Sequence, residues 1–285
     1  MEFVPTECVI GAVVLGHSLG APPSETEAEA IETALERYGV LIFREQQITP
    51  GQQVAWSRTF GTLEPTARVE ARLPSYPEIF VVGNTGKKIV SFAPADGSGD
   101  LEWHADHIHL ETTARASMLY CRETPPIGGQ TLFACMYTAF ETLSPSAQEE
   151  ADGLVARHSV SGLQNFLRTQ GEEGAADGDY AVPEALVVKW PLVRRHPRTG
   201  RRALYFGSKV TIGIEGWEDR RARDYIAAIN AHATAPALQY SHQWAPGDAV
   251  LWDNRRVLHA GTPFDTRQYR REMHRTTLRE DQPVS

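Results

Sequence analysis

Short runs of apolar residues, separated by glycine, proline and polar clusters, form the main pattern along this chain. Such runs between turn-forming residues are typical of β-strands, because a helix usually shows a longer periodic segment. The strands that we expect lie at about 9–15, 40–43, 79–82, 103–109, 117–122, 131–135, 154–160, 187–193, 203–206, 239–244, 249–253, 257–259 and 273–278. Pro246-Gly247-Asp248 predicts a hairpin turn between two of them. The pattern therefore predicts a mainly β fold.

Helical signals flank these strands. Ser24 and Glu27 have the spacing of a capping box, and the helix that they begin is expected to end at Gly39. Thr49-Pro50 begins another helix, with proline at its first position. The helices that we expect cover about 24–39, 49–61, 137–152 and 217–232. Many short strands with flanking helices predict a double-stranded β-helix, or jelly roll. Without an internal repeat or a linker, residues 1–285 are expected to form a single domain.

Charge and composition narrow the class of partner. The chain has 28 basic and 36 acidic side chains, so its net charge is −8. This balance argues against nucleic acid as a partner, because polyanions bind to basic surfaces. An anionic substrate must then be attracted by local arginine residues. A small anionic organic molecule is therefore the partner that we expect.

Cysteine usage and hydropathy indicate the compartment. Cys8, Cys121 and Cys135 form an odd set without the spacing of a metal site, which favours a reduced, cytoplasmic protein. No segment approaches the length of a membrane span, so no membrane partner is expected. The apolar run at 9–15 contains a glycine and lacks a basic leader, so we do not interpret it as a signal peptide.

The most informative polar residues are His104, Asp106 and the distant His259. Two histidines and one carboxylate are the ligand set that leaves open positions on a ferrous ion. Residues i and i+2 of a strand point to the same side, so His104 and Asp106 can reach one metal from a single strand. His259 must then come from a second strand.

Two further histidines leave this interpretation open. An isolated His-x-Asp pair is common by chance, and His107 and His109 make the segment dense in ligands. A dinuclear zinc hydrolase uses a similar cluster, but in the order His-x-His-x-Asp-His, which this chain does not follow. His109 shares the strand parity of His104 and His107 does not. We favour a structural or substrate-pocket role for both.

Arg271 and Arg275 form a second constellation. On a strand, both side chains face the same side, and arginine keeps its charge when it binds carboxylates in a buried place. They therefore suggest two bound anions, or one that is held strongly. The alternative is a solvated basic edge, which would consist of Arg270, Arg271, Arg275 and Arg279.

Thr131 follows Gly128-Gly129, a pair that permits a tight turn or a close approach of the backbone. A hydroxyl group directly after such a turn can hydrogen-bond a carboxylate. The alternative is an ordinary turn before a strand.

Taken together, these motifs resemble a known family. They are Trp103-His104-Ala105-Asp106, Pro125-Pro126-x-Gly128-Gly129-x-Thr131, Gly247-Asp248-x-x-x-Trp252-Asp253-Asn254-Arg255-x-x-x-His259 and Arg270-Arg271-x-x-x-Arg275. In this order they are similar to the taurine dioxygenase/2,4-dichlorophenoxyacetate dioxygenase family of iron(II)- and 2-oxoglutarate-dependent oxygenases. The resemblance covers the chain from Gly11 to Leu278. The segment 189–202, which contains Lys189-Trp190-Pro191 and Gly200-Arg201-Arg202, looks closer to the aryloxyacetate branch than to the taurine branch.

The resemblance implies roles for individual residues. His104, Asp106 and His259 would hold Fe(II). Arg271, helped by Thr131, would bind the distal carboxylate of 2-oxoglutarate, and Arg275 would bind the anionic end of the primary substrate.

The chain also departs from the family pattern. Asp100 stands where the family often has an amide, and His107 and His109 replace residues that are usually small or apolar. These departures bear on the substrate pocket, for which Asp100, His109 and Phe206 are our candidates. Phe206 has plain core packing as its alternative, and the loop at 170–179 is a candidate lid.

The resemblance further implies the reaction. An enzyme of this kind consumes O2 and 2-oxoglutarate, releases succinate and CO2, and hydroxylates a small aryloxyalkanoate-like carboxylate, with ether cleavage through a hemiacetal as one outcome. The alternatives are a same-family oxygenase that acts on a sulfonate, sulfate ester or natural-product carboxylate, a zinc hydrolase, and a non-catalytic cupin-like binding protein. The family tends to assemble, so a homo-oligomer is expected.

Overall fold

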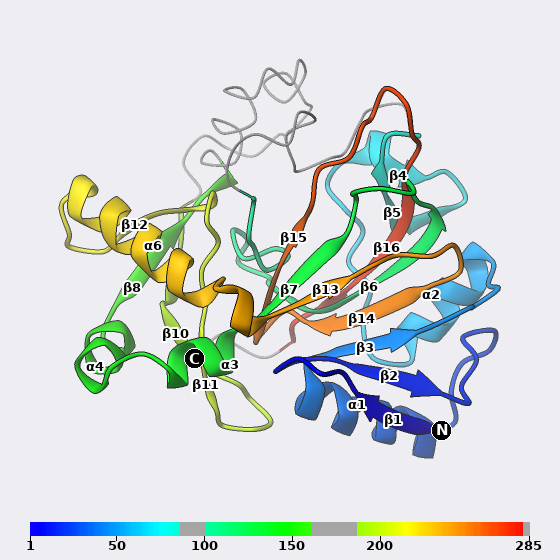
Figure 1. The fold of residues 1–285 in the computed structure, drawn as a ribbon, viewed down its shortest axis with the longest axis horizontal. Helices are drawn as coiled ribbons and strands as arrows, with labels where there is room; N and C mark the ends of the chain where they lie inside the picture. Colours follow the sequence, from blue (N-terminus) through cyan, green and yellow to red (C-terminus); the bar gives the residue numbers. More distant parts are fainter. Residues whose placement is uncertain (86–100, 161–186, 282–285) are drawn as a thin grey trace.

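A large β-sheet forms the framework of the protein (Figure 1). The computed structural model describes residues 1–85, 101–160 and 187–281. The eight strands lie in the order β1-β2-β3-β14-β6-β16-β5-β4, and only β2 and β3 pair in parallel. Their bounds are β1 Glu2–Pro5, β2 Ala12–Leu15, β3 Val40–Phe43, β14 Ala249–Asp253, β6 Ala114–Glu123, β16 Glu272–Arg279, β5 Tyr76–Gly83 and β4 Arg72–Leu73.

A smaller sheet packs against one face of this framework. It consists of β13 (Gln239–His242), β7 (Thr131–Cys135) and β15 (Val257–Gly261), in the order β13-β7-β15. Apolar side chains of both sheets share one hydrophobic cluster, which includes Phe133 and Leu258 from the small sheet and Leu119 and Trp252 from the large one. Two antiparallel sheets packed in this way form the expected jelly roll.

Two helices cover the other face of the large sheet. Helix α1 (Glu25–Tyr38) has Ser24 as its N-cap with both capping-box hydrogen bonds, and it ends at Gly39 in the left-handed conformation. Helix α2 (Pro50–Arg58) has the same type of cap at Thr49. Along β6, Met118 and Tyr120 face these helices, whereas Leu119 and Cys121 face the small sheet. Because successive side chains of a strand point to opposite faces, the large sheet is buried on both faces.

The remaining elements lie beside the small sheet, on the left in Figure 1. Strands β8 (Val155–His158), β9 (Val188–Pro191) and β12 (Thr211–Ile214) form one sheet, and β10 (Val193–Arg195) pairs with β11 (Arg202–Leu204). The helices are α3 (Met136–Glu141), α4 (Pro145–Asp152) and α6 (Asp219–Ala233), with a 3-10 turn at Pro236–Leu238. A second 3-10 turn, Val69–Ala71, lies instead next to β5 of the large sheet.

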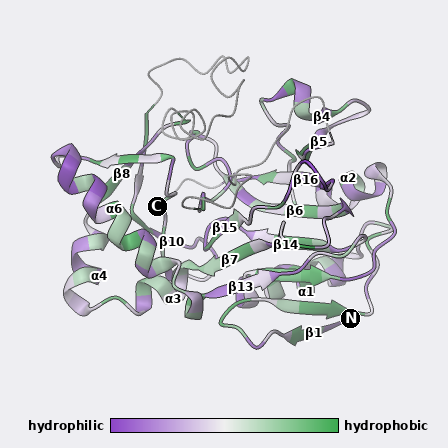
Figure 2. Ribbon diagram, turned by 45° about the horizontal axis from the view of Figure 1, so that its top comes forward, coloured by the Kyte–Doolittle hydropathy of each residue, from purple (hydrophilic) through white to green (hydrophobic). Residues whose placement is uncertain are grey.

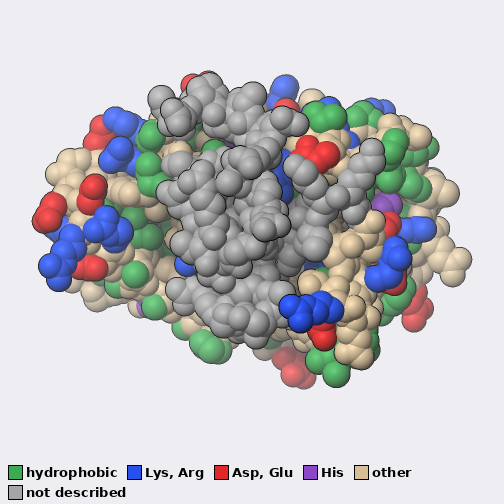
Figure 3. Space-filling view, turned by 90° about the horizontal axis from the view of Figure 1, so that it is seen from above, with side chains coloured by type: hydrophobic (Ala, Val, Ile, Leu, Met, Phe, Trp, Pro, Cys, Tyr) green, Lys and Arg blue, Asp and Glu red, His purple; other side chains and the backbone are tan. Residues whose placement is uncertain are grey.

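The surface of this region mixes charges of both signs. Figure 2 shows hydrophilic and hydrophobic stretches along α6. Figure 3 shows basic and acidic side chains side by side at the same end of the molecule, on the left. One such pair joins Arg221 of α6 to Glu150 of α4 at 3.7 Å. None of the helices in the described ranges combines the length and the apolar character that a membrane span needs.

Most of the expected elements are present, with small shifts at their ends. The main error is the strand expected at 103–109, where only His104 makes a single bridge. The chain turns directly after Asp106, because His107 adopts a left-handed conformation (φ 57°) that ends any extended run. The expected run at 187–193 is two strands, and β1, β4 and β12 are not among the expected strands. The loop expected at 170–179 lies outside the described residues.

Candidate functional site

His104, Asp106 and His259 lie together in the structure. One ligand atom of each lies within 4.8 Å of the others. Backbone hydrogen bonds create this proximity, since the His104 N–H donates to the His259 carbonyl at 3.1 Å and the His259 N–H donates to the His104 carbonyl at 2.9 Å. His259 is in the middle of β15, whereas His104 belongs to the loop that precedes β6. The backbone therefore holds the two imidazoles side by side without help from a metal.

The Asp106 carboxylate is buried and has a different partner at each oxygen. Ser117 Oγ donates to Oδ2 at 2.6 Å, and Arg275 Nη1 donates to Oδ1. Oδ1 also lies 3.9 Å from His104 Nε2, so this oxygen faces the histidines. The Asp106 N–H donates to Asn254 Oδ1 at 3.0 Å. Both the backbone and the side chain of Asp106 are thus fixed.

The two histidines have the surroundings of metal ligands. His104 Nδ1 is 3.0 Å from the Glu102 carbonyl, which leaves Nε2 directed toward Asp106. A ligating histidine commonly donates its other ring N–H to a backbone carbonyl in this way. His259 Nδ1 is buried and has no hydrogen-bond partner in the part of the chain that the structure describes. Two imidazoles and a carboxylate fit a ferrous ion that keeps open positions.

Electrostatics favour the protonation states that a metal requires. Burial, followed by the neighbouring His104, holds the pKa of His259 well below its usual value. Burial alone would raise the pKa of Asp106, but Arg275 and then the two histidines outweigh it, so this pKa is lowered. A neutral imidazole and an ionised carboxylate are the forms that coordinate metals.

His107 and His109 do not join the metal group. Among the described residues, the only cluster of ligands with suitable spacing is His104, Asp106 and His259. The parity argument for His109 is wrong, because it assumes a strand where the chain turns. Burial lowers the pKa of each of these two histidines to about 4, so both are neutral at neutral pH. The order of the ligand residues in the sequence and the single three-residue cluster in the described structure both disfavour a dinuclear zinc centre.

Arg271 is buried next to the double-glycine turn. Its Nε donates to the Gly129 carbonyl at 3.2 Å. Gly128 and Gly129 both have positive φ, and a Cβ on Gly128 would lie only 2.4 Å from the Pro263 carbonyl oxygen. The predicted close approach of the backbone is therefore present. Burial lowers the pKa of Arg271 to about 10, and no acidic side chain pairs with it among the described residues.

Thr131 is buried at the start of β7. Its Oγ1 accepts a hydrogen bond from Trp244 Nε1 at 3.0 Å. Because the indole nitrogen only donates, the proton of the Thr131 hydroxyl remains available for another acceptor.

The residues that we expected at the primary substrate lie in different surroundings. Arg275 lies against Asp106 and over the Phe80 ring, with its guanidinium carbon 4.9 Å from the ring centroid, so it does not form a solvated edge. Phe206 is fully buried in the main hydrophobic cluster, as its alternative of core packing requires. Asp100 lies outside the described residues.

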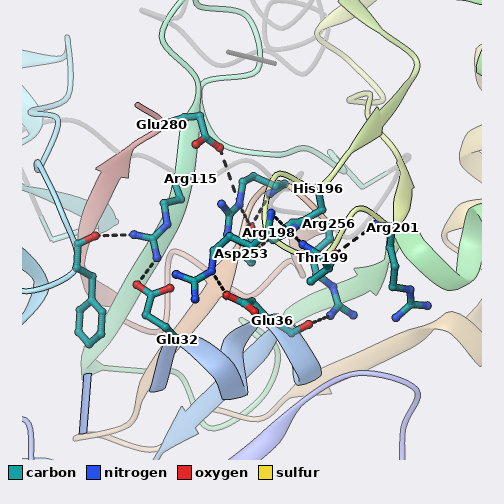
Figure 4. Close-up of polar contacts among 12 residues, drawn as sticks. Glu32, Glu36, Arg115, His196, Arg198, Thr199, Arg201, Asp253, Arg256 and Glu280 are labelled. Atoms are coloured by element: carbon teal, nitrogen blue, oxygen red, sulfur yellow. Dashed lines mark hydrogen bonds and ion pairs between the residues drawn. The ribbon is translucent and has the colours of Figure 1, made fainter. Parts of the chain in front are cut away.

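The motif at 252–255 divides its side chains between two tasks. Trp252 and Asn254 lie on the Asp106 side, where Asn254 Oδ1 accepts from both the Trp252 indole N–H and the Asp106 backbone N–H. Asp253 and Arg255 point away, into the polar network drawn in Figure 4, where Asp253 also meets His196 at 2.9 Å. Sequence reasoning missed Asn254 and Ser117. Asn254 lies inside a quoted motif, but no sequence signal singles out Ser117.

Comparisons with known proteins agree with this site. The model of the family "Taurine catabolism dioxygenase TauD, TfdA family" matches residues 3–277. The chain is 33% identical to the (S)-phenoxypropionate/alpha-ketoglutarate-dioxygenase of Sphingobium herbicidovorans, over 94% of this chain and 92% of that protein. It is also 33% identical to the alpha-ketoglutarate-dependent 2,4-dichlorophenoxyacetate dioxygenase of Cupriavidus pinatubonensis, over 91% of each chain. These relatives confirm the resemblance to the aryloxyacetate branch.

Two further similarities extend the picture. Pentalenolactone F synthase of Streptomyces avermitilis is 33% identical, over 92% of this chain and 88% of that protein. The crystal structure of AAD-2 in complex with Mn(II) and N-oxalylglycine superimposes with a TM-score of 0.81 at 28% identity, over 100% of this chain and 99% of that one. The family match over nearly the whole length, together with these relatives, shows that the chain belongs to the taurine catabolism dioxygenase TauD, TfdA family and is an enzyme that uses Fe(II), 2-oxoglutarate and O2.

Proposed function

We propose that this enzyme hydroxylates a small aryloxyalkanoate-like carboxylate. One substrate C–H bond becomes C–OH, while 2-oxoglutarate and O2 become succinate and CO2. The observation that carries this proposal is a pair of buried arginines four positions apart: Arg275, which contacts Asp106 of the His-Asp-His group, and Arg271, which lies at the double-glycine turn. Two buried cations suit a reaction with two anionic reactants. The similarity to phenoxypropionate and dichlorophenoxyacetate dioxygenases favours an aryloxy group on the substrate.

The three clustered side chains would provide the metal site. His104, Asp106 and His259 would hold Fe(II), which supplies the activation of O2 for the two oxidations. The protein itself contributes placement. The backbone bridge between His104 and His259 fixes the imidazoles, and the partners of Asp106 fix the carboxylate.

Arg271 and Thr131 would bind the distal carboxylate of 2-oxoglutarate. The Gly129 carbonyl holds the Arg271 Nε, so the terminal nitrogens of the guanidinium remain for a carboxylate. The Thr131 hydroxyl accepts from Trp244 and can donate its proton to the same anion. A bound carboxylate would also relieve the cost of burying an unpaired guanidinium.

Arg275 would hold the carboxylate of the primary substrate near the metal. A fixed anion determines which substrate carbon lies closest to the iron. If that carbon carries the aryl ether oxygen, hydroxylation gives a hemiacetal, and this collapses to a phenol and a carbonyl acid. Asp100, His109 and Phe206 remain candidate residues of the pocket.

We further infer the domain organisation, the compartment, the class of partner and the oligomeric state. The family match supports one dioxygenase domain over residues 1–285. Free Cys8, Cys121 and Cys135 suit a reducing cytoplasm. The net charge of −8 disfavours nucleic acid as a partner. A homo-oligomer remains a prediction that gel filtration with light scattering would test.

The proposed chemistry can be tested before the substrate is identified. Fe(II) and then 2-oxoglutarate are added anaerobically to the metal-free protein, and the weak visible absorption of the chelate is recorded. We expect the band in the parent and in His232→Ala, which changes a histidine on α6, and its loss in His104→Ala, Asp106→Ala and His259→Ala. Succinate release would then be measured with aryloxyacetates, sulfonates and sulfate esters. Tight zinc binding without the band would refute the oxygenase site, and release with sulfonates alone would refute the substrate class.

A further inference from the structure

A chain of buried hydrogen bonds leads from Trp252 to the Asp106 carboxylate. Trp252 Nε1 donates to Asn254 Oδ1 at 2.9 Å, and Asn254 Nδ2 donates to Ser117 Oγ at 3.0 Å. Ser117 Oγ then donates to Asp106 Oδ2 at 2.6 Å. The exposed fraction of each of these four residues is 3% or less, so water does not compete for the bonds.

The direction of every bond in this chain is determined. Asn254 Oδ1 faces two groups that can only donate, the Trp252 indole N–H and the Asp106 backbone N–H. The amide nitrogen of Asn254 must therefore face Ser117. Because the Ser117 oxygen accepts this bond, its single proton is left for Asp106 Oδ2. The amide orientation of Asn254 thus decides where the serine proton goes.

The fold places these groups independently of any metal. Ser117 and Trp252 are direct partners in the register of β6 and β14. Asn254 follows the end of β14, where its backbone N–H donates to the Arg115 carbonyl at 2.9 Å. On the other side of the same turn, Arg255 binds Asp253 through two nitrogens, at 2.8 and 2.7 Å. The turn that presents Asn254 is therefore rigid.

We propose that Asn254 and Ser117 are positioning residues for the iron ligand Asp106. They commit Oδ2 to the hydrogen bond with Ser117, whereas Oδ1, which accepts from Arg275 Nη1 and faces His104, keeps a second lone pair that would bind the metal. Asp106 would then hold iron chiefly through Oδ1, which would leave room at the metal for 2-oxoglutarate and O2. This inference rests on the proposed iron site.

Two substitutions test the chain at different links. Ser117→Ala removes the donor to Oδ2. Asn254→Asp replaces the amide nitrogen by an acceptor oxygen, which draws the serine proton away from Asp106 and adds a negative charge. Ser57→Ala is the matched control, because Ser57 is equally buried and its hydroxyl bonds Thr276 Oγ1 at 2.8 Å, away from the metal ligands.

The first readout is anaerobic Fe(II) affinity, and the second is the absorption spectrum of the Co(II)-substituted protein, which reports the number of ligand atoms. We expect the Kd for Fe(II) to rise about 10- to 100-fold in Ser117→Ala, and further in Asn254→Asp, because loss of a partner behind a metal ligand typically has this effect. Relative to the spectrum of the parent, the Co(II) spectrum should change in Ser117→Ala and Asn254→Asp but not in Ser57→Ala. Thermal unfolding of the metal-free proteins should show a similar decrease of the Tm in Ser117→Ala and Ser57→Ala.

The outcomes separate the two proposals. A parent protein that binds no Fe(II) overturns the proposed iron site itself. A parent that binds Fe(II), with both variants matching Ser57→Ala in Kd and Co(II) spectrum, overturns only the positioning role. If one variant does not fold, the other still decides, because the two perturb the same bond from different residues.

Discussion

Arg271 and Arg275 lie four positions apart but have different surroundings. Arg275 donates to the ionised Asp106, whereas Arg271 has a backbone carbonyl and a thiol nearby but no carboxylate among the described residues. Arg271 has no acidic partner among the described residues and suits the distal carboxylate of 2-oxoglutarate, whereas Arg275 gives one nitrogen to the iron ligand and keeps its buried Nε, which has no partner in the described structure, for the primary substrate. This difference supports separate roles for the two arginines.

Arg271→Ala is expected to raise the KM for 2-oxoglutarate about 10- to 100-fold, because a hydrogen bond to a charged group contributes about 1.5–3 kcal/mol. Steady-state succinate release at varied 2-oxoglutarate would measure it. Arg270→Ala is the control, since the Arg270 side chain is 66% exposed and pairs only with Glu123 in the described structure. Arg275→Ala should chiefly impair use of the primary substrate, and an equal loss of 2-oxoglutarate affinity in both variants would contradict the division of roles.

At the level of single residues, sequence reasoning finds rare side chains in unusual places. His104, Asp106 and His259 could be predicted because this set has one common chemical use. Asn254 and Ser117 could not be singled out, since serine and asparagine side chains have many structural uses and no single chemical one. Their importance depends on a register between β6 and β14 that only the fold reveals.

Among the elements, the turn at Gly128-Gly129 supports the Arg271 site. Gly128→Ala is expected to destabilise the protein more than Gly200→Ala, although both glycines are left-handed, with φ of 77° and 69°. The shared conformational cost is about 1–2 kcal/mol. Only at Gly128 would the new Cβ meet backbone, the Pro263 oxygen at 2.4 Å, whereas nothing lies within 4 Å at Gly200.

Urea unfolding of the two glycine variants would measure this difference. Gly128→Ala should also raise the KM for 2-oxoglutarate, because the adjacent Gly129 carbonyl holds Arg271. Equal free energies of unfolding of the two variants would contradict this prediction, because they would show that the backbone at Gly128 accommodates a Cβ without loss of stability.

The turn between β14 and β15 gives a prediction about pH. Arg255 and His196 outweigh the effect of burial and hold the pKa of Asp253 well below its usual value. Its stabilisation is therefore complete above the unfolded pKa of about 3.9 and is lost as the pH falls through the lower folded value. Asp253→Asn should lower the free energy of unfolding by about 3 kcal/mol at pH 7, because the buried Arg255 loses its bidentate partner and retains only Glu280, at 3.9 Å.

Urea titrations at pH 7 and below pH 4 would test this sign. The difference between the parent and Asp253→Asn should shrink in acid, and Asp152→Asn, at a surface pair, should show little effect at either pH. A difference that grows in acid would contradict the assignment.

Strands with strong apolar patterns, such as β3, β7 and β14, could be predicted with correct bounds. The segment at 103–109 alternates apolar and polar residues only from Trp103 to Asp106, and tertiary contacts shape it. Trp103 and His104 bond to Ser208 and His259, and the chain then turns at His107. A short alternating run cannot distinguish such a buried loop from a strand, because apolar residues are buried in both.

For the molecule as a whole, metal and cosubstrate should act as stabilising ligands. Fe(II) alone, at about 100 times its Kd, contributes about 2.7 kcal/mol, which raises the Tm by about 5 °C, and 2-oxoglutarate should add to this. Anaerobic calorimetry with and without a chelator would measure this shift. His259→Ala should show no shift, and a parent Tm that is insensitive to Fe(II) would contradict the linkage.

The sheet order has a consequence for synthesis of the chain. The central strand β6 (114–123) pairs with β14 (249–253) and β16 (272–279), so both of its neighbours come from the last part of the sequence. At ribosomal rates of about 5–20 residues per second, β6 waits roughly 7–30 s before its second neighbour is made. During that time its edges and apolar faces are open to aggregation. The edge of β6 closes only once β16 has been made, and the contact between Arg275 of β16 and the iron ligand Asp106 forms only at that same late stage.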